Sequence, residues 1–175
     1  MNFLPPILEP LQPAYEDVSI FRQLWNQLTF HQTPQRFKLA ADWTIPFPGE
    51  KITILIPKGF ITDFASIPRP LWPWIAPGGP LYVWAIVHDF AYQFGFLWDY
   101  GTTQVFAGKG HQFFDAMLRD GTIRDTGCRL EAEEAYVALI AFGGITWNKY
   151  RTLGPTAYNT NSLGLPGMTL KGPRL

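Results

Sequence analysis

The segment from Leu81 to Phe94, LYVWAIVHDFAYQF, constrains the fold more than any other part of the chain. It is apolar on nearly all sides, which is typical of a helix buried in the centre of a domain. Residues 57–80, which precede it, contain six prolines, so they predict a loop of fixed shape rather than a helix. The rest of the chain must therefore supply the elements that cover this helix.

The composition indicates a single domain with few charges. A chain of 175 residues is long enough for one domain with a hydrophobic core. Charged residues make up 16%, below the roughly 25% of an ordinary soluble domain. Aromatic residues also make up 16%. This combination indicates either a surface covered by a partner or a dense core with a few exposed aromatic side chains.

Charge and cysteine content exclude several classes of protein. The formal net charge is zero, so the sequence predicts neither a nucleic-acid-binding surface nor a basic membrane-binding surface. The single cysteine, Cys128, excludes an intramolecular disulfide and a cysteine-based zinc site. No stretch approaches the roughly 20 apolar residues of a membrane span, so none is expected.

The segments around the central helix predict an α+β fold, in which a small antiparallel sheet or hairpin packs against about three helices. Strands are expected over Arg36–Ile45 and Lys51–Ile56, with a hairpin loop between them. Residues 18–30 fit either a short helix or a pair of strands. Residues 95–110 are rich in glycine and are expected to be irregular.

Two further helices are expected after the central one. The first covers residues 111–120 and ends at Gly121, in the position of a left-handed cap. The second covers Cys128–Tyr150 and has several carboxylates in its first turns, where they complement the helix dipole. Residues 1–19 are then an extended N-terminal arm, residues 20–151 the domain, and residues 152–175 an extended C-terminal tail. Because both ends contain apolar residues, we expect them to lie on their own domain or on a neighbouring chain.

Candidate functional residues gather between Gly59 and Tyr92, where six polar side chains stand among apolar ones. They are Thr62, Asp63, Ser66, Arg69, His88 and Asp89. On a helix, His88 and Tyr92 share one face, whereas Asp89 is rotated by about 100°. Asp89 therefore does not orient His88, and Asp63 becomes the leading candidate for that role. Asp89 is a candidate to pair with Arg69, which would clamp the loop to the helix.

Two interpretations of these residues remain open. A histidine held by a carboxylate is the common core of general-base sites, which makes His88, Asp63, Asp89 and Tyr92 candidate catalytic residues. In the structural alternative, Asp63 caps a turn and His88 is its neutral hydrogen-bond partner. A metal site built from Asp63, His88 and Asp89 lacks a third ligand on a suitable face. We expect neither a metal nor a cofactor.

The strings GFITDFASIPR, at Gly59–Arg69, and AIVHDFAY, at Ala85–Tyr92, resemble a family of unknown function that is common in tailed bacteriophages and prophages. The family pattern is G-F-x-T-D-x-A-S-[IV]-P-R followed by H-D-x-x-Y. Members continue with a helix that carries A-D-x-x-F. Phe113–Met117 fits the later part of that helix, but Gly110 stands where the aspartate is usual. By the resemblance, one site carboxylate is missing, which weakens the catalytic interpretation.

The resemblance implies a structural or assembly component of the virion, in the tail or the head–tail connection. Such a protein would be made in the host cytoplasm and would contact other virion proteins through its N- and C-terminal arms. It would be a candidate homo-oligomer without nucleic acid as a partner. The alternative function is a small phage hydrolase that acts on the cell envelope, with His88 as the base and Asp63 as its orienting partner. Whether the protein is an enzyme stays open at this level.

Overall fold

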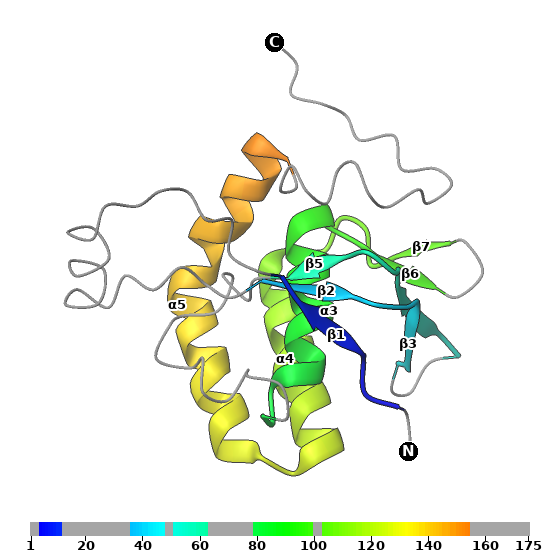
Figure 1. Cartoon of the computed structure of the whole chain (residues 1–175). Coiled ribbons are helices and arrows are strands. Elements are labelled where there is room, and N and C mark those ends of the chain that lie inside the picture. Colours follow the sequence, from blue (N-terminus) through cyan, green and yellow to red (C-terminus); the bar gives the residue numbers. More distant parts are fainter. Residues whose placement is uncertain (1–3, 12–35, 48–50, 63–78, 100–102, 155–175) are drawn as a thin grey trace, which may run out of the picture.

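The computed structural model describes residues 4–11, 36–47, 51–62, 79–99 and 103–154. In these residues the chain has the α+β fold that the sequence predicts, with two small antiparallel sheets beside three helices (Figure 1). The predicted element at residues 18–30 lies outside the described residues, as do most of the proline-rich loop and most of the two terminal segments.

Both sheets are short and antiparallel. The first has three strands in the order β1 (Leu8–Pro10), β2 (Phe37–Leu39) and β5 (Ile61–Thr62). The second has four strands in the order β3 (Trp43–Pro46), β4 (Thr53–Ile56), β6 (Leu97–Asp99) and β7 (Gln104–Val105). Inward-facing residues alternate with partly exposed ones along β3 and β4, as expected for strands with one face on the core.

The predicted hairpin is present, but its first strand is divided. β3 pairs with β4 from Trp43 opposite Ile56 to Pro46 opposite Thr53, as the sequence predicts. The expected continuous strand over Arg36–Ile45 is wrong, because the chain bends at Ala40 and Ala41. The residues before the bend form β2 in one sheet, and those after it form β3 in the other.

Residues 95–110 are more regular than predicted. β6 pairs with β4, and β7 pairs with β6, so this glycine-rich segment completes the second sheet. The side chain of Asp99 strengthens the junction, because its Oδ1 accepts a hydrogen bond from the backbone N–H of Thr53 at 3.0 Å. Hydrogen bonding to the edge of β4 makes this segment form strands although its local propensity for strand is weak.

The described part of the N-terminal segment lies on its own domain. β1 pairs with β2 from Leu8 opposite Leu39 to Pro10 opposite Phe37. Two side chains of the domain donate hydrogen bonds to the residues before β1. They run from Trp43 Nε1 to the carbonyl of Leu4 at 2.9 Å and from the Tyr82 hydroxyl to the carbonyl of Pro6 at 3.2 Å.

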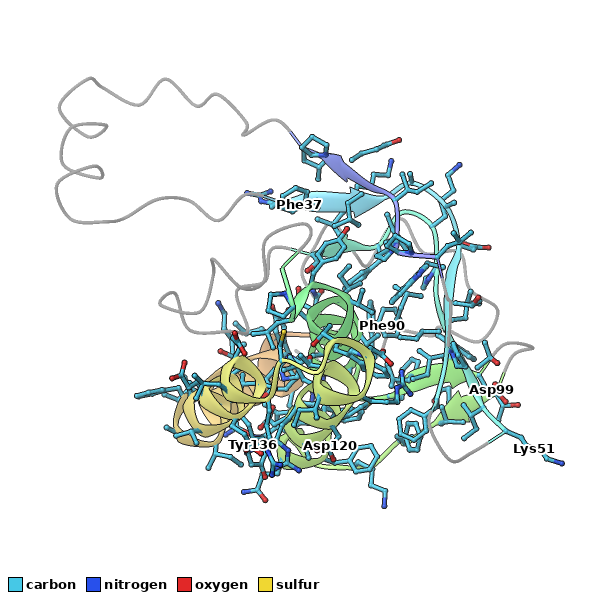
Figure 2. The ribbon with its side chains drawn as sticks, turned by 90° about the horizontal axis from the view of Figure 1, so that it is seen from below. Phe37, Lys51, Phe90, Asp99, Asp120 and Tyr136 are labelled. Carbon is cyan, nitrogen blue, oxygen red and sulfur yellow. The ribbon has the colours of Figure 1, made fainter. Side chains whose placement is uncertain are left out.

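The three helices pack against one another on one side of the molecule. They are α3 (Tyr82–Phe94), α4 (His111–Thr126) and α5 (Arg129–Leu153). α3 is buried along most of its length, as predicted, and lies between the sheets and the other two helices. Figure 2 shows Phe37 and Asp99 on the strand side of the molecule and Asp120 and Tyr136 on the helical side. No helix in the described part of the chain is both long enough and apolar enough to cross a bilayer.

α4 is longer than predicted, because Gly121 lies inside it instead of ending it. A Cβ atom on Gly121 would stand 2.2 Å from the indole ring of Trp84, so this glycine lets α4 approach α3 closely. The left-handed cap is Gly127, which has a φ of 73° and whose N–H bonds to the carbonyl of Ile123. The sequence signal for a glycine cap was correct in kind but assigned to the wrong residue.

Candidate functional site

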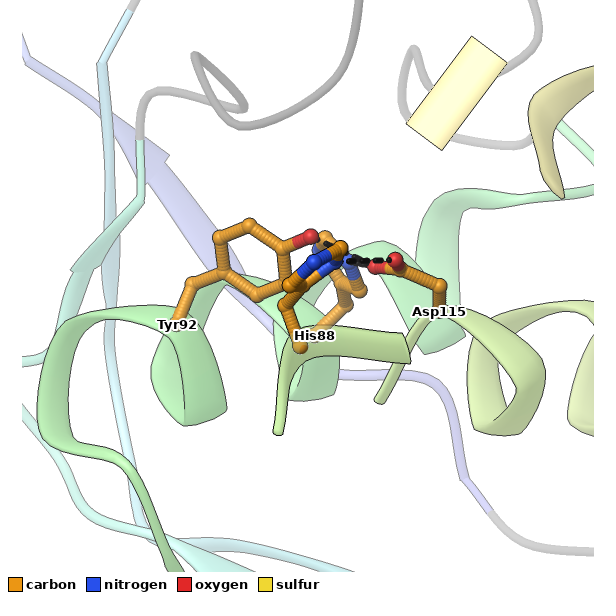
Figure 3. A network of polar contacts seen from close by, with 4 residues as sticks. His88, Tyr92 and Asp115 are labelled. Carbon is orange, nitrogen blue, oxygen red and sulfur yellow. Dashed lines mark hydrogen bonds and ion pairs between the residues drawn. The ribbon is translucent and has the colours of Figure 1, made fainter. Parts of the chain in front are cut away.

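The side of α3 that faces the other helices presents His88 and Tyr92 one turn apart. Their rings lie with centroids 4.1 Å apart. This is the shared face that the spacing of four residues predicts. Figure 3 shows both side chains reaching toward the same residue of α4, Asp115.

Asp115 accepts three hydrogen bonds from side chains. Its Oδ1 accepts from His88 Nε2 at 2.9 Å and from the Tyr92 hydroxyl at 2.6 Å. Its Oδ2 accepts from His111 Nδ1 at 3.0 Å, one turn earlier on the same helix. An ionised carboxylate can only accept, so each histidine nitrogen that faces it carries a proton. We call these four side chains, His88, Tyr92, His111 and Asp115, the Asp115 network.

Helix α5 covers the network with its smallest residues. A Cβ atom on Gly143 would lie 2.4 Å from the Tyr92 hydroxyl oxygen, so only glycine fits at that position. One residue later the space is wider, since a Cβ atom on Gly144 would lie 3.4 Å from His111 Nε2. Trp147 closes the end of the network, with its ring 5.4 Å from Tyr92 and 5.6 Å from Phe114 between centroids. The network therefore sits where three helices meet.

The network is sealed on all but one side. The side chains of His88 and Asp115 are 1% and 0% exposed, whereas that of His111 is 22% exposed. Burial alone would raise the pKa of Asp115. The hydrogen bond and positive charge of His88, with the hydrogen bonds from Tyr92 and His111, outweigh burial and hold this pKa below its ordinary value. Burial, the charge of Asp115 and the hydrogen bond to it raise the pKa of Tyr92, so its hydroxyl stays a donor.

One polar atom of the network stands out. His88 Nδ1 is buried and has no hydrogen-bond partner among the described residues. Because Nε2 carries the proton that Asp115 accepts, Nδ1 presents a lone pair when the imidazole is neutral and an N–H group when it is charged. A buried donor or acceptor without a partner costs about 1–3 kcal/mol, so native proteins rarely leave one without a reason.

Asp89 faces away from His88 on α3, by the rotation of about 100° that adjacent helical residues have. It is 1% exposed, and its Oδ2 accepts a hydrogen bond from the Thr62 hydroxyl on β5 at 2.5 Å. The same side of the helix is otherwise aromatic, with Phe90 packing edge-on against Phe60 at 5.2 Å between ring centroids. Asp89 therefore ties the helix to the first sheet and does not touch the Asp115 network.

Of the four predicted site residues, the structure brings together His88 and Tyr92 and separates Asp89 from them. Asp63, which we expected to orient His88, lies outside the described residues, as do Ser66 and Arg69. In the described part of the chain the carboxylate that holds His88 is Asp115, which the sequence reasoning missed. The spacing of four residues between His111 and Asp115 was an available signal for it.

The carboxylate that seemed lost at Gly110 has a counterpart within the same helix. Gly110 is exposed and stands just before α4, at its N-cap position. Asp115 lies one and a half turns further on and points into the core. In the described residues, no three His, Cys, Asp or Glu side chains are placed to hold a metal ion. The network is thus a set of proton donors around one carboxylate.

A protein family of unknown function, DUF1353, matches residues 37–127, just over half of the chain. The chain belongs to this family. No curated protein and no solved structure shows a significant match to the chain itself.

The family match includes both polar junctions of α3 but not α5. Thr62, His88, Asp89, Tyr92 and Asp115 all lie within the matched residues. The match ends at Gly127, the cap of α4, so the helix that covers the network lies beyond the DUF1353 region. The part that carries the His88–Asp115 pair therefore coincides with the family region, and the glycines that fit over the pair come from outside it.

Proposed function

We propose that the protein is a structural or assembly component of a bacteriophage particle, located in the tail or the head–tail connection. The Asp115 network would then be a lock that joins α3, α4 and α5 and gives the domain a fixed shape. The protein would be made in the host cytoplasm and would leave the cell as part of the virion.

The observation that carries this proposal is the burial of the polar cluster. A general acid or base must come within hydrogen-bond reach of the proton that it transfers. The carboxylate of Asp115 is fully buried, and its bonds to His88, Tyr92 and His111 engage both oxygens. Such a saturated carboxylate is well suited to fixing three helices and poorly suited to meeting a substrate.

Two further features support an assembly role. The motifs of the central segment resemble a family common in tailed phages. α5 also leaves large apolar side chains exposed, among them Val137, Phe142 and Ile145. Exposed apolar surface of this kind commonly marks a site of protein association. A buried polar network together with exposed apolar side chains on α5 suits a component that binds other proteins.

The test is to purify particles of a phage that encodes this chain by density-gradient centrifugation and to quantify the protein by mass spectrometry. We expect it to sediment with the particles in a fixed ratio to the major capsid protein and to cross-link to tail or connector proteins. A cytoplasmic host protein in the same gradient is the control for contamination. Presence in the lysate only as free protein, with none in the particles, would contradict the proposal.

A second candidate function is a small hydrolase, and one observation favours it. His88 Nδ1 is unpartnered among the described residues, while Asp115 holds the opposite ring nitrogen. A carboxylate on one nitrogen and a lone pair on the other is the arrangement of a general base. In this alternative Asp115 takes the orienting role that we predicted for Asp63, and the substrate is a cell-envelope polymer.

The hydrolase is tested by release of dye from labelled envelopes by the purified full chain. The alternative predicts release by the native protein and its loss in His88→Gln, with Ile7→Gln as an exposed control that retains it. Release that is absent from the native protein, or unchanged in a folded His88→Gln variant, would exclude it.

A further inference from the structure

Helix α5 carries a stripe of exposed apolar side chains on the side away from α3 and α4. Leu130, Val137, Phe142 and Ile145 are each between 60% and 74% exposed. The buried residues Ala132, Ala135, Leu139 and Gly143 line the opposite side. Figure 1 shows α5 at the outer edge of the helical layer, with α4 and α3 on its inner side. Among the described residues, the stripe is thus a helix face without a partner and not an edge of the core.

The distribution of charge along α5 is as unusual as the stripe. No charged residue occurs from Ala135 to Asn148, the middle of the helix. The carboxylates Glu131, Glu133 and Glu134 lie before this stretch together with one basic residue, Arg129, so the first turns carry a net negative charge. The basic residues Lys149 and Arg151 follow it. A helix that is apolar around its whole circumference is normally buried. The middle of α5 is apolar on both sides, yet only one side is covered within the described residues.

We propose that a second copy of this chain covers the stripe, with the two α5 helices packed antiparallel about a two-fold axis. In this arrangement the net negative first turns of each helix lie beside Lys149 near the end of the other, whereas Arg151 is held within its own chain by the carbonyls of Tyr92 and Gln93. A parallel arrangement would instead place three glutamates of one helix beside three of the other, which is repulsive. The charge pattern of α5 is therefore complementary to itself in one direction only.

The positions of individual residues agree with a two-fold axis near Ala141. Ala141 is exposed and small, so it allows two helices to approach closely at the centre of the contact. Glu134 and Lys149 are both exposed and lie about equally far from this centre, one toward each end. Each residue turns the helix by about 100°, so Glu134 and Lys149 lie about 20° and 80° around the axis to the same side of Ala141. A two-fold axis keeps each edge on its own side, so Glu134 of one copy meets Lys149 of the other.

The length of the stripe suits such a contact. From Leu130 to Ile145 the helix rises about 22 Å, which is about four turns of helix–helix packing. Closed two-fold dimers are the commonest oligomers, and their interfaces are self-complementary. This inference does not depend on a place in the virion, since the pairing would form between free chains.

Sedimentation equilibrium of the full chain tests the proposal. We expect a dimer that dissociates on dilution. Ile145→Glu should give a folded monomer, because the new glutamate lies four residues before Lys149 and supports the helix while it disrupts the contact. Ile7→Glu changes a similarly exposed apolar side chain away from α5, so it should leave the dimer intact. A native protein that is monomeric at every concentration would overturn the proposal, as would a dimer that Ile145→Glu leaves unchanged.

Charge reversal tests the direction of pairing. Glu134→Lys and Lys149→Glu should each raise the dissociation constant of the dimer about tenfold, since each replaces attraction by repulsion at two symmetric places. The double variant should restore the native dissociation constant. If the double variant is weaker than either single variant, the helices are not antiparallel. If Ile145→Glu lowers stability without changing the mass of a monomer, another part of the same chain covers the stripe and the proposal is wrong.

Discussion

A buried aspartate lies on each of two sides of α3, and the hydrogen bonds to the two carboxylates differ. On the side facing the sheets, Asp89 accepts a hydrogen bond from Thr62 within an otherwise aromatic contact. On the side facing the helices, Asp115 gathers donors from two elements beneath a glycine of α5. The first joins a helix to one strand, and the second bonds α3 to α4 at the point where α5 packs over them.

This difference shows where the domain can tolerate change. The aromatic side depends on burial of large rings, which is non-directional and adapts to small shifts. The helical side depends on distances and angles at one carboxylate, so removing one donor leaves the buried charge of Asp115 with fewer hydrogen bonds to offset its burial. We therefore expect substitutions around Asp115 to have the larger effects, and the following experiments measure the contrast.

The largest effect is expected when the sealed donor is removed. His88→Ala should lower the free energy of unfolding by about 3–5 kcal/mol, because it breaks a buried charged pair. His111→Ala is the matched control, since this histidine bonds the same carboxylate from a partly exposed position and should cost about 1 kcal/mol or less. Urea denaturation measures both. Equal losses in the two variants would show that burial does not set the strength of these bonds.

Single hydroxyl groups can be removed from each side of α3. Tyr92→Phe deletes a donor to Asp115 and Thr62→Val deletes a donor to Asp89, and each should lower stability by about 1.5–3 kcal/mol. The two losses should add in the double variant, since the carboxylates lie on opposite faces and share no partner in these bonds. In contrast, Tyr92→Phe and His88→Gln should not be additive, because both act on Asp115. Additivity in both pairs would remove the distinction between a network and separate bonds.

The covering helix offers a pair of adjacent glycines. Gly143→Ala forces a methyl group against the buried Tyr92 hydroxyl and should lower stability by about 1–3 kcal/mol. Gly144→Ala enters ordinary contact distance and should be neutral or stabilise the helix by up to about 1 kcal/mol. Thermal unfolding of the two variants distinguishes them. A neutral Gly143→Ala would mean that α5 does not press on the network.

The smallest effect is expected from acid. The pKa of Asp115 is lower in the folded protein than the value of about 3.9 in an unfolded chain. Its contribution to stability is therefore complete above that value and disappears as the pH falls through the folded-state pKa. The difference in unfolding free energy between the native protein and Asp115→Asn should shrink on acidification below about pH 4. A difference that stays constant with pH would show that the charge of Asp115 is not involved.

Much of the local structure could be predicted from the sequence, because it depends on periodicity. The all-round apolarity of Leu81–Phe94 predicted a buried helix, and the 3.6-residue turn placed His88 beside Tyr92 and away from Asp89. Asp115 could not be found this way, since its position relative to His88 is set by how α4 packs on α3. Gly121 was assigned as a helix cap, because glycine is common both at helix ends and where two helices approach closely. Its contact with the ring of Trp84 shows that it has the second role. Likewise β6 forms because β4 offers it a partner.

The central claim is that the Asp115 network holds the helices together and does not perform chemistry. It is tested most directly by the free energy of unfolding of Asp115→Asn at neutral pH, measured by urea denaturation against the native protein. The amide keeps the size of the side chain but removes its charge and presents donors to donors. A structural network predicts a loss of about 3 kcal/mol or more. An unchanged or increased free energy of unfolding, which is common when a strained active-site group is removed, would contradict the claim.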